Sequence, residues 1–86
     1  MPGFIHQFTQ HVTDKDGLRY SILARGEPRS DGTWEGWLEF YPLEGTGPKL
    51  RTERETTQPN ETALEYWASG LEPLYFEGAL ARAVKR

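Results

Sequence analysis

Apolar and polar residues alternate along the first third of the chain, which is the pattern of strands with one buried face. Residues 4 to 13 and residues 18 to 25 both show this alternation. The segment between them, residues 14 to 17 (Asp-Lys-Asp-Gly), is typical of a tight hairpin turn. We therefore expect the first two strands to pair antiparallel. The residues expected on the buried face of the first strand are Phe4, Phe8 and Val12.

The clearest alternation in the chain spans residues 33 to 41, which we predict to be a third strand. Trp34, Leu38 and Phe40 share one face, and this face is expected to lie against the core. The opposite face is predicted to be a solvent-facing surface of acidic and aromatic side chains, with the ring of Trp37 exposed. Its members are Glu35, Trp37, Glu39 and Tyr41.

A polar, charged segment at residues 49 to 56 is predicted to be a fourth strand at the edge of the sheet, because charged side chains protect an edge from pairing with other chains. If Phe40 pairs with Leu50, Glu39 faces Arg51 on the outer side. Such a cross-strand ion pair contributes about 0.2 to 1 kcal/mol.

Residues 59 to 69 are predicted to form the main helix. Pro59 stands near the first helical position and Glu61 in the first turn, where the helix dipole favours an anion. Apolar residues then recur at spacings of three and four, as on the buried side of a helix. Gly70 is expected to end the helix in a left-handed conformation. The apolar stripe consists of Ala63, Leu64, Trp67, Ala68 and Leu71.

The last residues, 73 to 85, are compatible with strand or helix. We expect a short strand at 74 to 76 followed by a helical tail. The whole chain, residues 1 to 86, is then a single small α+β domain: an antiparallel four-stranded meander with one main helix packed on one face, and a short strand and helical tail at the C-terminus. The predicted core consists of Trp34, Leu38, Phe40, Leu64 and Trp67.

Composition adds three constraints. The chain has no cysteine, which excludes disulfides, thiol nucleophiles and cysteine-ligated metals. No stretch of 18 apolar residues and no signal peptide is evident, so we expect a cytoplasmic protein without a membrane segment. Eleven aromatic residues are more than a core of this size can hold, which favours an aromatic surface or self-association as a homodimer.

No motif in the sequence specifies an enzyme, a cofactor or a metal. His6 and His11 are an odd number of residues apart, so on one strand they point to opposite faces and cannot share a metal. Glu35 and Glu39 share a face, but we interpret them as solvated carboxylates rather than a catalytic pair. The Gly-Thr-Gly-Pro segment at 45 to 48 lacks the residues of a phosphate-binding loop and is interpreted as a turn.

The net charge of −3 disfavours nucleic-acid binding, which depends on neutralising phosphates. Local basic groups are Arg51 with Arg54, and the terminal Arg82, Lys85 and Arg86. A protein or a second copy of the chain is therefore the expected partner.

Three short motifs in residues 18 to 77 resemble the HicB-like antitoxin fold, a reduced relative of ribonuclease H. They are Asp-Gly-Thr-Trp at 31 to 34, Tyr-Pro-Leu-Glu-Gly at 41 to 45, and Pro-Asn-Glu-Thr-Ala-Leu at 59 to 64. The chain departs from that family in the longer segment between Gly45 and Pro59, in an additional first strand, and in ending without the family's DNA-binding segment. The resemblance implies a non-catalytic interaction module that binds a small toxin-like protein.

The leading hypothesis is thus a non-enzymatic protein-binding domain. Its expected binding residues are Glu35, Trp37, Glu39, Tyr41 and Arg51. Two alternatives remain: a nucleic-acid contact through Arg51, Arg54 and the basic tail, and, less favoured, a hydrolase that uses carboxylates with a divalent metal.

Overall fold

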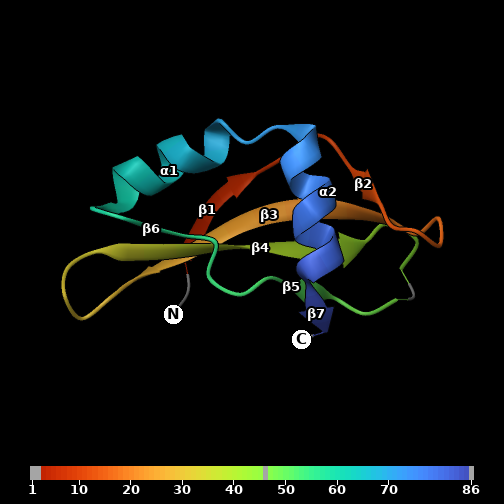
Figure 1. The fold of residues 1–86 in the computed structure, drawn as a ribbon, viewed down its shortest axis with the longest axis horizontal. Coiled ribbons are helices and arrows are strands. Elements are labelled where there is room, and N and C mark those ends of the chain that lie inside the picture. The colour runs from red at the N-terminus through yellow and green to blue at the C-terminus, as the bar shows by residue number, and fades with distance from the viewer. Residues whose placement is uncertain (1–2, 46, 86) are drawn as a thin grey trace.

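An antiparallel sheet carries two helices on one of its faces (Figure 1). The computed structural model describes residues 3 to 45 and 47 to 85, and within them the sheet has seven strands, several of them very short. The strands are β1 (Gly3–Gln7), β2 (Val12–Thr13), β3 (Arg19–Pro28), β4 (Trp34–Pro42), β5 (Leu50–Arg51), β6 (Thr56–Gln58) and β7 (Val84–Lys85). The helices are α1 (Glu61–Ser69) and α2 (Pro73–Arg82).

The predicted α+β class is confirmed, and the sheet is larger than the four strands expected. Its order is β1-β3-β4-β5-β7, with β2 also paired to β3 and β6 also paired to β4. The hairpin of β3 and β4 is the longest ladder and runs from the pair Tyr20–Pro42 to the pair Pro28–Trp34. The predicted register between β4 and β5 is confirmed, because Glu39 pairs with Arg51 and the next residue along β4 pairs with Leu50.

The core lies between the sheet and the two helices. Of the five predicted core residues, Leu38, Phe40 and Leu64 are fully buried, whereas Trp34 and Trp67 are only half-buried at its border. The rest of this core consists of buried apolar residues of β1, β2 and β3, of the segment between β1 and β2, and of both helices: Ile5, Phe8, Val12, Tyr20, Ile22, Ala24, Ala68, Phe76, Ala79 and Leu80.

Leu64 fixes α1 on the sheet. Its two methyl groups sit over Gly26 of β3 and Gly36 of β4, which are paired directly across the ladder. A Cβ atom would lie 2.4 Å from a Leu64 methyl carbon at Gly26 and 2.6 Å at Gly36, so neither position has room for a larger residue. The helix therefore approaches the sheet closely at one defined point.

The start of α1 is set by a cap. The side-chain oxygen of Asn60 accepts the backbone N–H of Ala63 at 2.8 Å, so the helix begins at Glu61, two residues after the start that we predicted at Pro59. Gly70 follows the last helical residue as predicted, but its φ of −93° is not the left-handed conformation we expected.

The first predicted strand is interrupted. Residues 4 to 13 form β1 and β2 with a break between them, and the ladder of β1 with β3 has a bulge between Phe4 and His6. A bulge adds one residue and so reverses the alternation. Ile5 is buried as a result, whereas Phe4, which we expected in the core, is 56% exposed.

The fourth predicted strand is also divided. Of residues 49 to 56, only 50 to 51 and the last residue belong to strands, in β5 and β6. Between them, Thr52 donates its N–H to the Leu38 carbonyl at 3.0 Å, and its hydroxyl accepts the Leu38 N–H at 3.1 Å. A side chain thus replaces a ladder bond at this point. β5 is not an edge strand, because β7 pairs with its other side.

The expected strand at 74 to 76 is wrong. Those residues belong to the first turn of α2, where Pro73 fits because the first helical N–H groups need no partner within the helix. Phe76 points inward and its ring meets that of Phe8 edge-on, with the centroids 4.7 Å apart. The helical tail begins earlier than predicted and ends before β7. No helix of the described residues is long and apolar enough to cross a membrane.

Candidate functional site

Neither helix covers the outer face of the sheet, which we call the open face. Because side chains alternate along a strand, the open face takes every second residue of β3 and β4. It also takes Arg51, which pairs with Glu39 across β4 and β5. All five predicted binding residues therefore belong to one surface of the fold: Glu35, Trp37, Glu39, Tyr41 and Arg51.

Trp37 is not exposed as we predicted, because its exposed fraction is only 1%. It lies on the open face and not in the core, but other side chains cover it. The guanidinium of Arg51 stacks over its ring at 4.0 Å from the centroid, and Arg25 is its partner across the ladder with β3. The sequence feature that could have indicated this burial is an arginine on each strand next to β4: Arg25 on β3 and Arg51 on β5.

Glu39 is the centre of a hydrogen-bond cluster on the open face. Its carboxylate accepts the hydroxyl of Tyr41 at 2.6 Å, the indole N–H of Trp37 at 3.1 Å and the Nε–H of Arg25 at 3.1 Å. We expected a solvated carboxylate, but Glu39 is only 8% exposed. Burial by itself raises its pKa, and the bonds from Tyr41, Trp37 and Arg25 outweigh that effect, so the pKa of Glu39 is lowered overall.

The pKa values of two partners of Glu39, Arg25 and Tyr41, are raised, which is the direction that keeps both groups protonated. The pKa of Arg25 is raised by its hydrogen bonds with Tyr41 and Glu39. The pKa of Tyr41 is raised first by burial and then by its bond to the carboxylate. Both groups therefore keep their protons at neutral pH while Glu39 stays ionised. This arrangement holds side chains in place, and it gives Glu39 no tendency to donate or take up a proton.

Cations surround this cluster. The ammonium of Lys49 lies 5.5 Å from the ring centroid of Tyr41. Glu35, the other predicted carboxylate, has the guanidinium groups of Arg29 and Arg54 each at 3.8 Å from one of its oxygens. The open face is thus richer in basic groups than the net charge of the chain suggests. These groups are Arg19, Arg25, Arg29, Lys49, Arg51 and Arg54.

The structure does not join the predicted basic tail to Arg51 and Arg54. Arg82 belongs to α2, where it donates to Glu55 at 2.6 Å, and Glu55 also accepts the hydroxyl of Tyr75. These bonds tie α2 to the segment before β6. Lys85 lies in β7, and Arg86 lies outside the described residues.

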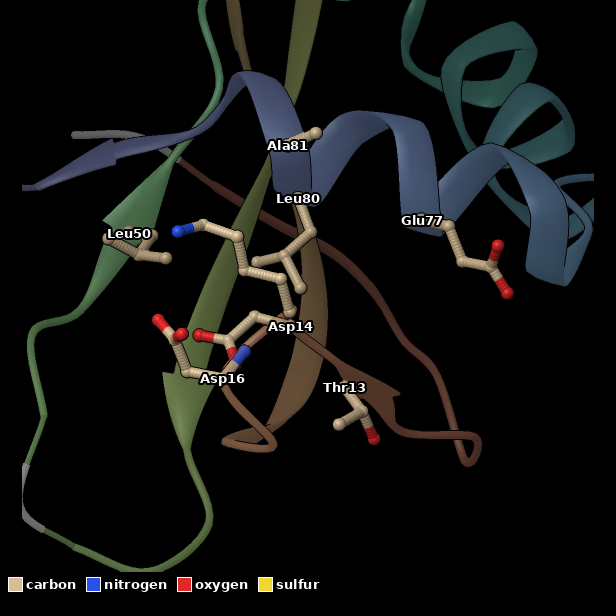
Figure 2. Close-up of a pocket in the computed structure, with 8 residues that line it drawn as sticks. Thr13, Asp14, Asp16, Leu50, Glu77, Leu80 and Ala81 are labelled. Carbon is tan, nitrogen blue, oxygen red and sulfur yellow. The ribbon is translucent and has the colours of Figure 1, made fainter.

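Two adjoining cavities lie along the other side of the molecule, where α2 faces β2: the larger lies beside the turn that joins β2 to β3, and the smaller beside the segment that joins β1 to β2. The larger has a volume of about 330 Å³, and its lining includes Lys15 and, on opposite sides in Figure 2, the apolar Leu50 and Leu80 and the acidic Asp14 and Asp16. Glu77 points away from the two aspartates (Figure 2). The smaller cavity, of about 230 Å³, is lined in part by His11. Sequence reasoning did not anticipate either cavity.

Nothing in the described residues forms a metal centre, since no three side chains of His, Asp or Glu gather in the way that would hold an ion. Comparisons with protein-family models, with curated proteins and with solved structures found no significant match to this chain.

Proposed function

We propose that the protein is a non-enzymatic binding domain that uses the open face to contact another protein, and that it acts as a homodimer. The observation that carries the proposal is the sheet face that neither helix covers, on which Arg51 stacks on the ring of Trp37 and the buried carboxylate of Glu39 bonds to that indole and to Arg25. Arginine and tyrosine are among the residues most enriched at the centres of protein interfaces, and the buried Trp37 supports the arginine that stacks on it.

The fixed side chains of the open face favour binding. Arg51 is stacked on Trp37, and Arg25 is bonded to Glu39, so ordering these groups on association costs little further conformational entropy. The HicB-like resemblance in the sequence agrees with this proposal and adds a partner class: a small toxin-like protein. A partner with acidic groups would complement the exposed edges of the guanidinium groups.

The test is calorimetric titration of the protein with the product of the neighbouring gene. We expect binding that Arg51→Met weakens by at least about tenfold, because methionine still covers the Trp37 ring but cannot donate hydrogen bonds. Arg82→Met, on α2, is the matched control and should bind as the unmodified protein does. Equal affinities for the two variants would refute the role of the open face.

A second function, contact with nucleic acid, is favoured by one observation: six of the ten basic side chains gather on the open face. It predicts affinity for single-stranded RNA or DNA that falls steeply with salt concentration. Fluorescence anisotropy at two salt concentrations separates it from the first proposal, and absence of binding at low salt would exclude it.

A further inference from the structure

One long edge of the sheet has no neighbouring strand. β1 stands at the end of the strand order and pairs with β3 on one side only, while α1 packs over its face. Figure 1 shows β1 at the margin of the sheet, below α1. No other strand of the described residues pairs with the second side of β1. An edge strand of this kind presents backbone N–H and C=O groups that can bind another strand.

The β1 edge lacks the charged side chains and the proline that protect many edge strands against such pairing. Proteins commonly block an edge with charged side chains or proline. Residues 3 to 13 contain no Asp, Glu, Lys, Arg or Pro, although these five residue types make up about a third of the whole sequence. The bulge between Phe4 and His6 is a feature of the ladder with β3. It turns Phe4 outward, so a large ring stands exposed next to the free edge.

We propose that β1 pairs antiparallel with β1 of a second copy about a two-fold axis, joining the two sheets into one. A two-fold axis places β1 of one copy against β1 of the other, so the side chains of β1 must not repel a second copy of themselves. The uncharged β1 meets this condition. β7 at the opposite end of the sheet does not, because two copies of Lys85 would come close together.

The dimer would also give the exposed ring of Phe4 a contact. In a continuous antiparallel sheet, Phe4 would lie on the same face as cross-strand residues of the partner's β1, where an aromatic side chain contributes to pairing. A two-fold axis perpendicular to the sheet puts the two open faces on the same side of the dimer. The dimer would then present a single binding surface with twice the area of one open face.

This inference rests on the homodimer in the proposed function and names its interface. Sedimentation equilibrium of the full chain tests both. We expect a mass twice the 9.9 kDa of one chain. The double variant Phe4→Lys with Gln7→Lys places charges at two exposed positions of β1 and should weaken dimerisation on the order of tenfold or more. Circular dichroism checks that the variant is folded.

Val84→Lys is the matched control, because Val84 is 50% exposed, in the strand at the opposite end of the sheet. It should dimerise as the unmodified protein does. If the β1 variant still dimerises, or if Val84→Lys dissociates the dimer, the proposed β1 interface is wrong but the homodimer of the proposed function stands. A monomer at every concentration would overturn both. Masses that grow without limit would overturn the two-fold pairing.

A second measurement remains informative if the β1 variant does not fold. The chain has no cysteine, so a spin label can be attached to Gln7→Cys alone. β1 has five residues and paired strands lie about 4.8 Å apart, so labels on two paired copies of β1 lie within about 20 Å of one another and should show dipolar broadening. A label on Val84→Cys should not. Broadening at Val84→Cys and none at Gln7→Cys would refute the proposal.

Discussion

Replacing Glu39 with glutamine tests whether the buried carboxylate organises the open face. One carboxylate oxygen accepts from both Arg25 and Tyr41, and the other accepts from Trp37. Glutamine has the same shape, but one of its two terminal groups is an NH₂ donor. If the NH₂ replaces the second oxygen, it meets the indole N–H of Trp37. If the amide is turned round, the NH₂ meets the guanidinium of Arg25 instead.

Either orientation leaves a donor without its acceptor. An unpaired N–H on buried Trp37 costs about 1 to 3 kcal/mol, and a lost bond between Arg25 and a charged acceptor costs about 1.5 to 3 kcal/mol. We therefore expect Glu39→Gln to lower the free energy of unfolding by about 2 kcal/mol. For a domain of this size, the melting temperature should fall by roughly 8 to 16 °C.

The assay is urea unfolding followed by tryptophan fluorescence, with Glu35→Gln as the control on the same strand and face. Glu35 is more exposed and its two arginine contacts are longer, at 3.8 Å, so its replacement should cost less than about 1 kcal/mol. If the two variants unfold within about 0.5 kcal/mol of one another, the hydrogen-bonded carboxylate does not stabilise the fold and our reasoning is wrong.

The pH dependence gives an independent readout of the same group. The pKa of Glu39 is lowered in the folded protein from its ordinary 4.5, so the folded state holds the proton more weakly than the unfolded state does. Its stabilising effect is complete above the unfolded pKa and is lost as the pH falls through the folded pKa. Below about pH 4.5, unfolding curves of Glu39→Gln should change less steeply with pH than those of the unmodified protein.

Three further predictions follow from single contacts. Gly36→Ala should destabilise the protein by about 1 to 3 kcal/mol because a Cβ would meet Leu64. Gly78→Ala on α2 should instead stabilise it by about 0.5 to 1 kcal/mol. In thermal melts, the melting temperature should fall for the first variant and rise for the second. Thr52→Val should cost about 1 to 3 kcal/mol in urea unfolding by leaving a buried N–H of β4 unpaired, and Thr52→Ser should cost less. Burial and its bond to an acidic partner raise the pKa of Tyr75 to about 12, so stability is complete below pH 10.0 and is lost as the pH rises towards 12; Tyr75→Phe should reduce that alkaline loss in a pH series of melts.

Sequence patterns were most informative where one strand has one buried face. The alternation in residues 33 to 41 predicted which side of β4 faces the core, and the pairing of Glu39 with Arg51 followed from the register. The same alternation could not predict the exposure of Trp37. Alternation assigns a face, whereas exposure also depends on long side chains from other strands, here Arg51, which stacks on the ring.

The missed elements share a physical cause, which is that a tertiary contact outweighs the local pattern. The bulge between Phe4 and His6 reverses which residues of β1 face the core, and no residue in the sequence indicates it. The hydroxyl of Thr52 replaces a ladder bond and so allows the chain to leave the sheet between β5 and β6. Pro73 is compatible with a strand start or a first helical turn, and the contact of Phe76 with Phe8 stabilises the helix.

The order of elements along the chain has a consequence for synthesis on the ribosome. All the long strands precede residue 60, and both helices that cover their apolar side follow it. The nascent strands therefore keep Ile22, Leu38 and Phe40 in contact with water until the residues of both helices have left the exit tunnel. During that interval the emerging chain is the form most in need of a chaperone.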